Sequence, residues 1–194
     1  MGVATVWRRC AVPVSEALFE QVALADDTAR WELICGRLRP KPPMTAFHGQ
    51  IARNLARQLN LQLPDGELTV EREGPNLRVP GGNYRIPDVC VVPLEVVIQR
   101  QREYPTALEI YDQPMPLVAE VWSPSTGDYD VDQKLREYQQ RGDLEIWRLH
   151  PFERTLTAWV RQPDGGYVET SYAGGTVRPT YLPGVAIDLD RLFG

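Results

Sequence analysis

Two short stretches of the chain are apolar almost without interruption, and this pattern predicts buried strands. Residues 117–122 read LVAEVW and residues 89–92 read VCVV, so apolar side chains fall on both faces of each strand. Strands of this kind are covered on both sides by other elements. Glu120 lies within the first stretch, and Asp88 stands directly before the second. We therefore expect two carboxylates in apolar surroundings.

Helical periodicity marks two longer segments. Residues 48–63, HGQIARNLARQLNLQL, repeat apolar side chains at helical intervals, which predicts a helix with one face against a core. A second helix follows the Glu120 strand, and its inward face is defined by Val131, Leu135 and Tyr138. Lys134 falls on the same face, so we expect its side chain to point inward. Candidate caps for this helix are Ser125, Thr126 and Asp128.

Shorter signals fill the rest of the chain. Ser15 opens a predicted capped helix over residues 15–25, and residues 182–194 form an apolar end that we expect to dock on the body. The other segments are expected to be, in order, two strands joined by a tight turn at Gly36 (30–40), a strand (67–73), a turn-rich surface loop (74–84), a short helix or irregular crossover (94–115), a hairpin (144–151 and 154–162) and a further strand (165–175).

Length and composition are those of an ordinary globular protein of 194 residues, which favours one domain. The chain has no apolar run near the roughly 18 residues of a membrane span and no signal-peptide start, so we expect a cytoplasmic protein with no membrane partner. Three separated cysteines and two histidines support neither a disulfide framework nor a tetrahedral zinc site. The net charge of −5 argues against coating nucleic acid through a general positive field, although a local basic patch or a bound metal remains open.

The two acids need partners. An ionised carboxylate left unpaired in an apolar strand costs several kcal/mol, so Glu120 requires a cation, hydrogen-bond donors or a raised pKa. Lys134 is one candidate cation, and the alternative for this lysine is a surface ion pair with Asp130, four residues earlier. Two carboxylates placed side by side are tolerated mainly when a cation lies between them, and oxygen ligands suit a divalent metal.

Several candidate residues also have structural interpretations that the sequence leaves open. Asp88 follows Pro87 at the start of its strand, where it is either a turn residue or a functional acid. His48 stands at the start of its helix. It is either a structural histidine, which caps the helix or has its hydrogen bonds satisfied, or a residue near an active site. Arg85, three residues before Asp88, is either a phosphate contact or a solvated surface arginine.

The order of these signals resembles the Uma-type family of restriction-endonuclease-like proteins, a branch of the PD-(D/E)XK nuclease superfamily. The matching pieces are WELICGRL followed by FHG, RIPDVCVV, PLVAEVWSPST, DVDQKLREYQQRGDLEIWRLHP and LPGVAIDL. The resemblance implies an α/β fold, with an α+β mixed sheet flanked by helices. This restriction-endonuclease-like core would span residues 31–190 of a single domain, after an N-terminal scaffold segment over residues 1–30. The resemblance also implies metal-dependent endonuclease activity.

The resemblance assigns roles to particular residues. Asp88 and Glu120 would be catalytic ligands of Mg²⁺, with Mn²⁺ as a substitute, and the Val121 carbonyl would be a third ligand. The superfamily signature places a lysine two residues after the acid, where this chain has Trp122. Lys134, delivered from the following helix, would replace it and would orient the water or balance developing charge.

Accessory roles follow from the same resemblance. The superfamily often adds an acid from its first helix, but residues 48–60 contain none, so Glu32, His48 or Gln50 would stand in. Tyr138 is a further accessory candidate beside Lys134. The expected partner is nucleic acid, with DNA favoured. Because cutting both strands of a duplex commonly needs two active sites, we also expect a homodimer or a higher even homo-oligomer.

Two other function classes compete with the nuclease. One is a catalytically inactive nucleic-acid or protein-binding module on a nuclease fold, although a decayed site is expected to replace costly buried charges by apolar residues. The other is a glycosidase that uses paired carboxylates, in which an inward lysine is less natural. Metal binding discriminates among the three, because only the nuclease requires a divalent ion at Asp88 and Glu120.

Overall fold

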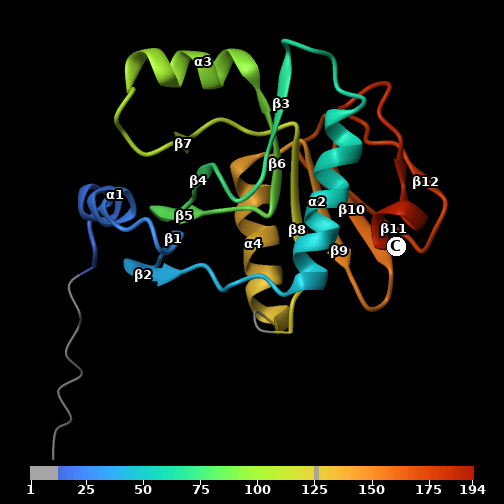
Figure 1. The fold of residues 1–194 in the computed structure, drawn as a ribbon, viewed down its shortest axis with the longest axis horizontal. Coiled ribbons are helices and arrows are strands. Elements are labelled where there is room, and N and C mark those ends of the chain that lie inside the picture. Colours follow the sequence, from blue (N-terminus) through green and yellow to red (C-terminus); the bar gives the residue numbers. More distant parts are fainter. Residues whose placement is uncertain (1–12, 125–126) are drawn as a thin grey trace, which may run out of the picture.

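The structure is a computed structural model that describes residues 13–124 and 127–194, without the side chains of residues 127–131 (Figure 1). Its helices are α1 (Glu16–Ala25), α2 (Ala46–Asn60), α3 (Leu94–Glu103), α4 (Gly127–Arg141) and α5 (Leu189–Phe193). Its strands are β1 (Trp31–Ile34), β2 (Arg37–Pro40), β3 (Leu68–Glu71), β4 (Asn76–Val79), β5 (Asn83–Arg85), β6 (Val89–Pro93), β7 (Ile110–Tyr111), β8 (Leu117–Val121), β9 (Glu145–His150), β10 (Thr155–Arg161), β11 (Tyr167–Tyr172), β12 (Thr176–Val177) and β13 (Ile187–Asp188). The predicted α/β class, with mixed sheet and flanking helices, is confirmed.

A mixed sheet forms the centre of the described part, in the order β11-β10-β9-β8-β6-β3. Strands β8 and β9 are parallel, and their neighbours β6 and β10 run antiparallel to them. All five residues of β8 are buried, as the uninterrupted apolar run predicted. In β6, Val89 and Val91 pack into one core cluster, whereas Cys90 and Val92 pack into another. Both faces of the inner strands are therefore covered.

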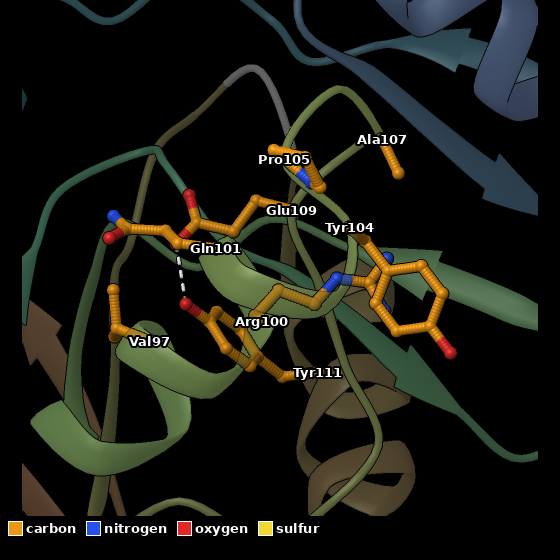
Figure 2. A pocket seen from close by; sticks show the side chains of 8 residues that line it. All are labelled: Val97, Arg100, Gln101, Tyr104, Pro105, Ala107, Glu109 and Tyr111. Carbon is orange, nitrogen blue, oxygen red and sulfur yellow. Dashed lines mark hydrogen bonds between the residues drawn. The ribbon is translucent and has the colours of Figure 1, made fainter.

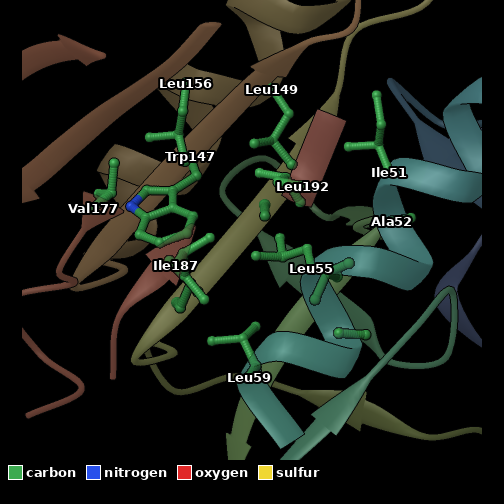
Figure 3. Close-up of a cluster of buried hydrophobic side chains, with 14 of the residues drawn as sticks. Ile51, Ala52, Leu55, Leu59, Trp147, Leu149, Leu156, Val177, Ile187 and Leu192 are labelled. Atoms are coloured by element: carbon green, nitrogen blue, oxygen red, sulfur yellow. The ribbon is translucent and has the colours of Figure 1, made fainter. Parts of the chain in front are cut away.

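Helix α2 covers one face of this sheet. Ile51, Leu55 and Leu59 pack with Trp147 of β9, and Figure 3 shows these side chains meeting between the helix and the strands. Leu192 of α5 joins the same cluster, so the apolar end of the chain docks as predicted. Helix α2 begins at Ala46, with Thr45 as its N-cap, which is earlier than the predicted start. His48 is therefore not the cap, and its side chain is available for another contact.

Helix α4 covers the opposite face, and it positions the residues that sequence placed on its inner side. Tyr138 and Leu135 pack against Val118 of β8 and Ile146 of β9. The candidate caps Ser125, Thr126 and Asp128, the predicted core residue Val131 and the proposed partner Asp130 lie outside the residues whose side chains the structure describes.

The predicted surface loop over residues 74–84 is wrong. It contains β4 and β5, an antiparallel hairpin within a second sheet in the order β2-β1-β5-β4-β7. Gly81 and Gly82 have positive φ angles of 84° and 69°, which glycine adopts without strain, so they close the turn. Strands β4 and β5 have only four and three residues, too few for a clear alternation of apolar and polar side chains. The glycines and Pro80 between them therefore indicated a loop. This hairpin carries Arg85 against α4.

In the described residues, no helix is both long and apolar enough to cross a bilayer.

Candidate active site

Asp88 and Glu120 meet because β6 and β8 are antiparallel neighbours. Val89 pairs with Ala119, so continuing this register by one residue sets Asp88 opposite Glu120. The backbone N–H of Val121 donates a hydrogen bond of 2.8 Å to Oδ2 of Asp88. Asp88 is 1% exposed and Glu120 is 8% exposed, so both acids lie in a nearly dry setting. Two separated stretches of sequence thus form one acidic pair.

Two cationic or protonatable side chains surround Asp88. The Lys41 ammonium lies 2.8 Å from Oδ1, and Nε2 of His48 lies 2.9 Å from Oδ2. Burial alone would raise the pKa of Asp88, but the charge of Lys41 and the contact with His48, aided by Lys134, hold the pKa well below its usual range. Asp88 is therefore held as a carboxylate.

Glu120 is in a different electrostatic position. Lys134 lies 3.2 Å from its Oε2, and the hydroxyl of Tyr138 donates a hydrogen bond of 2.7 Å to its Oε1. Burial and the negative charge of Asp88 raise the pKa of Glu120, and together they outweigh the opposing effects of Lys134 and Tyr138. The two acids consequently differ in pKa, and Glu120 is the one that an added cation would stabilise more.

A second layer of ion pairs lies under this pair. Lys134 also lies 3.7 Å from Glu32, whose Oε1 accepts the backbone N–H of Ile86 at 3.0 Å. Arg85 bridges two acids, with Nη1 3.4 Å from Glu32 and Nε 2.6 Å from Glu137. Charged groups buried this deeply persist only when paired and hydrogen-bonded. The layer therefore fixes the position of Lys134.

The expected surface position of Arg85 is wrong, because Arg85 is fully buried between these carboxylates. Its possible phosphate contact stays a prediction, and a guanidinium engaged with two acids does not favour it. Glu137 of α4 is also buried, and Asn83 of the hairpin donates a hydrogen bond to it. The surface alternative for Arg85 fails because the predicted loop is a hairpin, which packs against α4 and covers both side chains.

The other predicted site residues divide into two groups. Glu32, His48 and Tyr138 contact the acid pair or Lys134, as described above. Gln50 is exposed, and its amide lies near Gly194 at the end of the chain. Its accessory role stays a prediction.

Lys41 is a site residue that the sequence did not reveal. It follows β2 in the segment Pro40–Pro43, and it reaches both Asp88 and the backbone carbonyl of Ile86, the latter at 2.9 Å. The lysine belongs to no periodic segment, and its contacts span more than forty residues of chain. Its proline-flanked position carries no signal beyond that of a loop, so only the fold could place it.

The donor set fits a divalent metal in part. Asp88 and Glu120 supply hard oxygen atoms, the ligands that Mg²⁺ and Mn²⁺ prefer. The buried Oδ1 of Asp88 accepts no hydrogen bond of good geometry, but the Lys41 ammonium lies 2.8 Å from it, so a metal ion bound at this oxygen would have to displace the ammonium. Among the described residues, no cluster of three or more His, Cys, Asp or Glu side chains is arranged around one point. Two carboxylates would therefore need water, backbone or phosphate oxygens to complete the coordination.

A surface hollow beside α3 is separate from these residues. It has a volume of about 280 Å³ and is lined by Val97, Arg100, Gln101, Tyr104, Pro105, Ala107, Glu109 and Tyr111. Figure 2 shows the Tyr111 hydroxyl pointing to Glu109, to which it donates a hydrogen bond. Because none of the predicted site residues lines the hollow, the acid pair remains the candidate active site.

Comparison with known proteins identifies the fold and the family of this chain. A solved structure from Anabaena variabilis, described as a putative nuclease belonging to DUF820, superposes with a TM-score of 0.69 at 18% sequence identity, over 87% of this chain and 92% of that one. At that identity the likeness concerns the fold. No protein with a curated description matches the chain in sequence. The Uma2 family, described as "Putative restriction endonuclease", matches residues 17–190. The chain therefore belongs to the Uma2 family of restriction-endonuclease-like proteins.

Proposed function

We propose that this protein is a metal-dependent endonuclease that hydrolyses phosphodiester bonds of nucleic acid. The observation that supports it best is the pairing of Asp88 with Glu120, flanked by Lys41 and Lys134 in a nearly dry site. A binding module gains nothing from four buried charges, which cost several kcal/mol each to desolvate. A site that must hold a metal and an anionic phosphate uses both signs of charge.

Asp88 and Glu120 would hold Mg²⁺, with Mn²⁺ as a substitute, and the Val121 carbonyl is the third ligand that we propose. When bound, the metal lowers the pKa of a water molecule and stabilises negative charge on the phosphate. Asp88 is suited to a permanent ligand because its low pKa keeps it ionised over the physiological range. Glu120, with its raised pKa, changes its charge more readily with its surroundings.

We assign to Lys134 the role of stabilising the negative charge that develops in the transition state. Its ammonium is held between Glu120 and Glu32, so it is oriented before substrate arrives and needs little reorganisation. Tyr138 fixes the other oxygen of Glu120 through its hydroxyl. His48 lies 2.9 Å from Asp88, and we propose it as a positioning residue that stands in for the acid that the superfamily often adds from its first helix.

The nature of the substrate and the assembly are part of the proposal. We propose that the substrate is DNA and that the protein acts as a homodimer or a higher even homo-oligomer, since paired sites allow both strands to be cut. Light scattering at micromolar concentration tests the assembly. A mass near that of one 22.0 kDa chain would contradict it.

Cleavage of supercoiled plasmid DNA in Mg²⁺ and in EDTA tests the activity. We expect the parent to nick or linearise the plasmid only with the metal, and Asp88→Asn and Glu120→Gln to lose that activity by orders of magnitude. Glu95→Gln, which neutralises an exposed acid on α3, is the matched control and should cut like the parent. Thermal unfolding of each variant shows whether it has folded. Cleavage that persists in both folded site variants, or in EDTA, would contradict the mechanism.

A further inference from the structure

Four aromatic rings from three segments gather beside the candidate active site. They are Phe47 at the start of α2, Trp122 after β8, His150 at the end of β9 and Phe152 in the turn to β10. Trp122 stacks on His150 with ring centroids 4.6 Å apart, and Phe152 lies 6.0 Å from Trp122 and 6.1 Å from Phe47. We name these four residues the aromatic platform.

The aromatic platform is unusually exposed for its size. Phe152 is 65% exposed and Phe47 is 36% exposed, although large aromatic side chains contribute most to cores when buried. Trp122 and His150, the two partly buried members, are held in place: the backbone N–H of Trp122 donates to the carbonyl of Leu149 at 2.8 Å, and Nδ1 of His150 accepts the N–H of Glu153 at 3.1 Å. A fixed, exposed aromatic surface is a feature of binding sites more than of cores.

Its position ties it to the acid pair through the backbone. Trp122 directly follows Val121, whose N–H bonds to Asp88, and it occupies the place two residues after Glu120. Phe47 directly precedes His48, whose imidazole lies 2.9 Å from Asp88. Two members of the platform are therefore one residue away from groups that touch the same carboxylate. A strand with a phosphate at Asp88 would carry its neighbouring bases past these rings.

We infer that the aromatic platform stacks an unpaired nucleobase of the strand whose phosphate occupies the acid pair, so the substrate is single-stranded or locally opened nucleic acid. The inference rests on the proposed nuclease function. Bases inside a duplex already stack on each other, so only an unpaired base presents a free face to a protein ring. With a net charge of −5, the chain has no general positive field to hold a strand, and stacking supplies affinity for any base without one.

A second copy of this chain is the rival occupant. The chemistry of the platform favours a base, because it borders groups suited to phosphate and includes an imidazole among its rings. An interface between copies would instead need a wide apolar area, of which the platform would be a small part. Removing one ring should lower the affinity for a nucleic acid if a base is the occupant, and should change the mass of the assembly if a second copy is. One set of variants therefore distinguishes the two.

Fluorescence anisotropy with a labelled single strand, its blunt duplex and an abasic strand of equal length tests the inference. The full chain is titrated with Ca²⁺ in place of Mg²⁺ at fixed low salt, so that a divalent cation is available to the acid pair and affinities are comparable, and a gel run after each titration checks that the strand is intact. Phe152→Ala should weaken binding of the single strand by about 5- to 150-fold, the range for one stacked aromatic, and leave the other two probes within about twofold. Phe152→Trp should retain the parent affinity. Leu61→Ala removes a 75% exposed apolar side chain at the far end of α2 and is the matched control.

Three results of the binding experiment would overturn the inference. It fails if Phe152→Ala binds the single strand like the parent, if the parent binds the abasic strand equally well, or if the parent does not bind the single strand. A change in sedimenting mass of Phe152→Ala with unchanged affinity would assign the platform to an interface between copies. Plasmid cleavage is measured in parallel: cleavage without base-dependent binding refutes only the platform. Base-dependent binding without metal-dependent cleavage refutes only the nuclease function.

Discussion

Replacing Lys134 by Met should destabilise the fold in a pH-dependent way. The substitution keeps a stem of similar length and removes the ammonium that lies 3.2 Å from Glu120. At that separation an effective dielectric constant near 20 gives an attraction of about 5 kcal/mol, and breaking a buried ion pair usually costs about 3–5 kcal/mol. Because the pKa of Glu120 is already raised, loss of Lys134 raises it further, and the acid then escapes the penalty by binding a proton.

The direction of the pH effect follows from this protonation. A carboxyl whose pKa is higher in the folded state stabilises the fold at low pH and loses that contribution as pH rises through the folded-state pKa. Urea unfolding should therefore show a loss of about 3–5 kcal/mol for Lys134→Met at pH 8.5 and less than half of it at pH 5. Mn²⁺ should restore more stability to the variant than to the parent, since it replaces the missing charge.

The control for this experiment is Arg136→Met, which removes an exposed positive charge from the same helix. Its effect should stay within about 0.5 kcal/mol at both pH values. An equal loss of stability for Lys134→Met at pH 5 and pH 8.5 would refute the reasoning. The cost would then come from packing of the stem and not from the charge.

Three further changes test the surroundings of the site. Tyr138→Phe removes the hydroxyl that bonds to Glu120 and should cost about 1.5–3 kcal/mol by urea unfolding at pH 7; no loss would show that this bond does not matter. Arg85→Met leaves buried carboxylates without their guanidinium and should cost about 3–5 kcal/mol, whereas a neutral result would place the arginine at the surface. Burial raises the pKa of Asp143 to about 6, so the stability of the parent relative to Asp143→Asn should fall by roughly 2.4 kcal/mol between pH 4 and pH 7; a flat difference would contradict the shift.

The strands and helices that build the acid pair could be predicted from the sequence because their signals are local. The uninterrupted apolar run of β8 required cover on both faces, and an acid within such a run required a partner. The period of α4 placed Lys134 and Tyr138 on the inner face, where both contact Glu120. The sequence predicted that Asp88 and Glu120 lie side by side but did not give the order of the strands. The antiparallel register of β6 and β8 explains the pairing.

The parts that sequence missed depend on contacts between distant segments. Lys41 lies in a proline-flanked connection whose composition indicates only a loop, and its role appears when that loop crosses Asp88. The burial of Arg85 against Glu137 was missed because the hairpin of β4 and β5 is built from short strands around two glycines, which the sequence indicated as a loop. A polar residue on a helix is buried or exposed according to what packs on it, and propensity does not contain that information.

Calorimetric titration with Mn²⁺ tests the central claim most directly, because a divalent ion shared by Asp88 and Glu120 distinguishes the proposed nuclease from its rivals. We predict that the folded parent binds Mn²⁺, that affinity rises with pH as Glu120 loses its proton, and that Asp88→Asn and Glu120→Gln each abolish the binding signal. Undiminished Mn²⁺ binding in both folded variants would contradict the account.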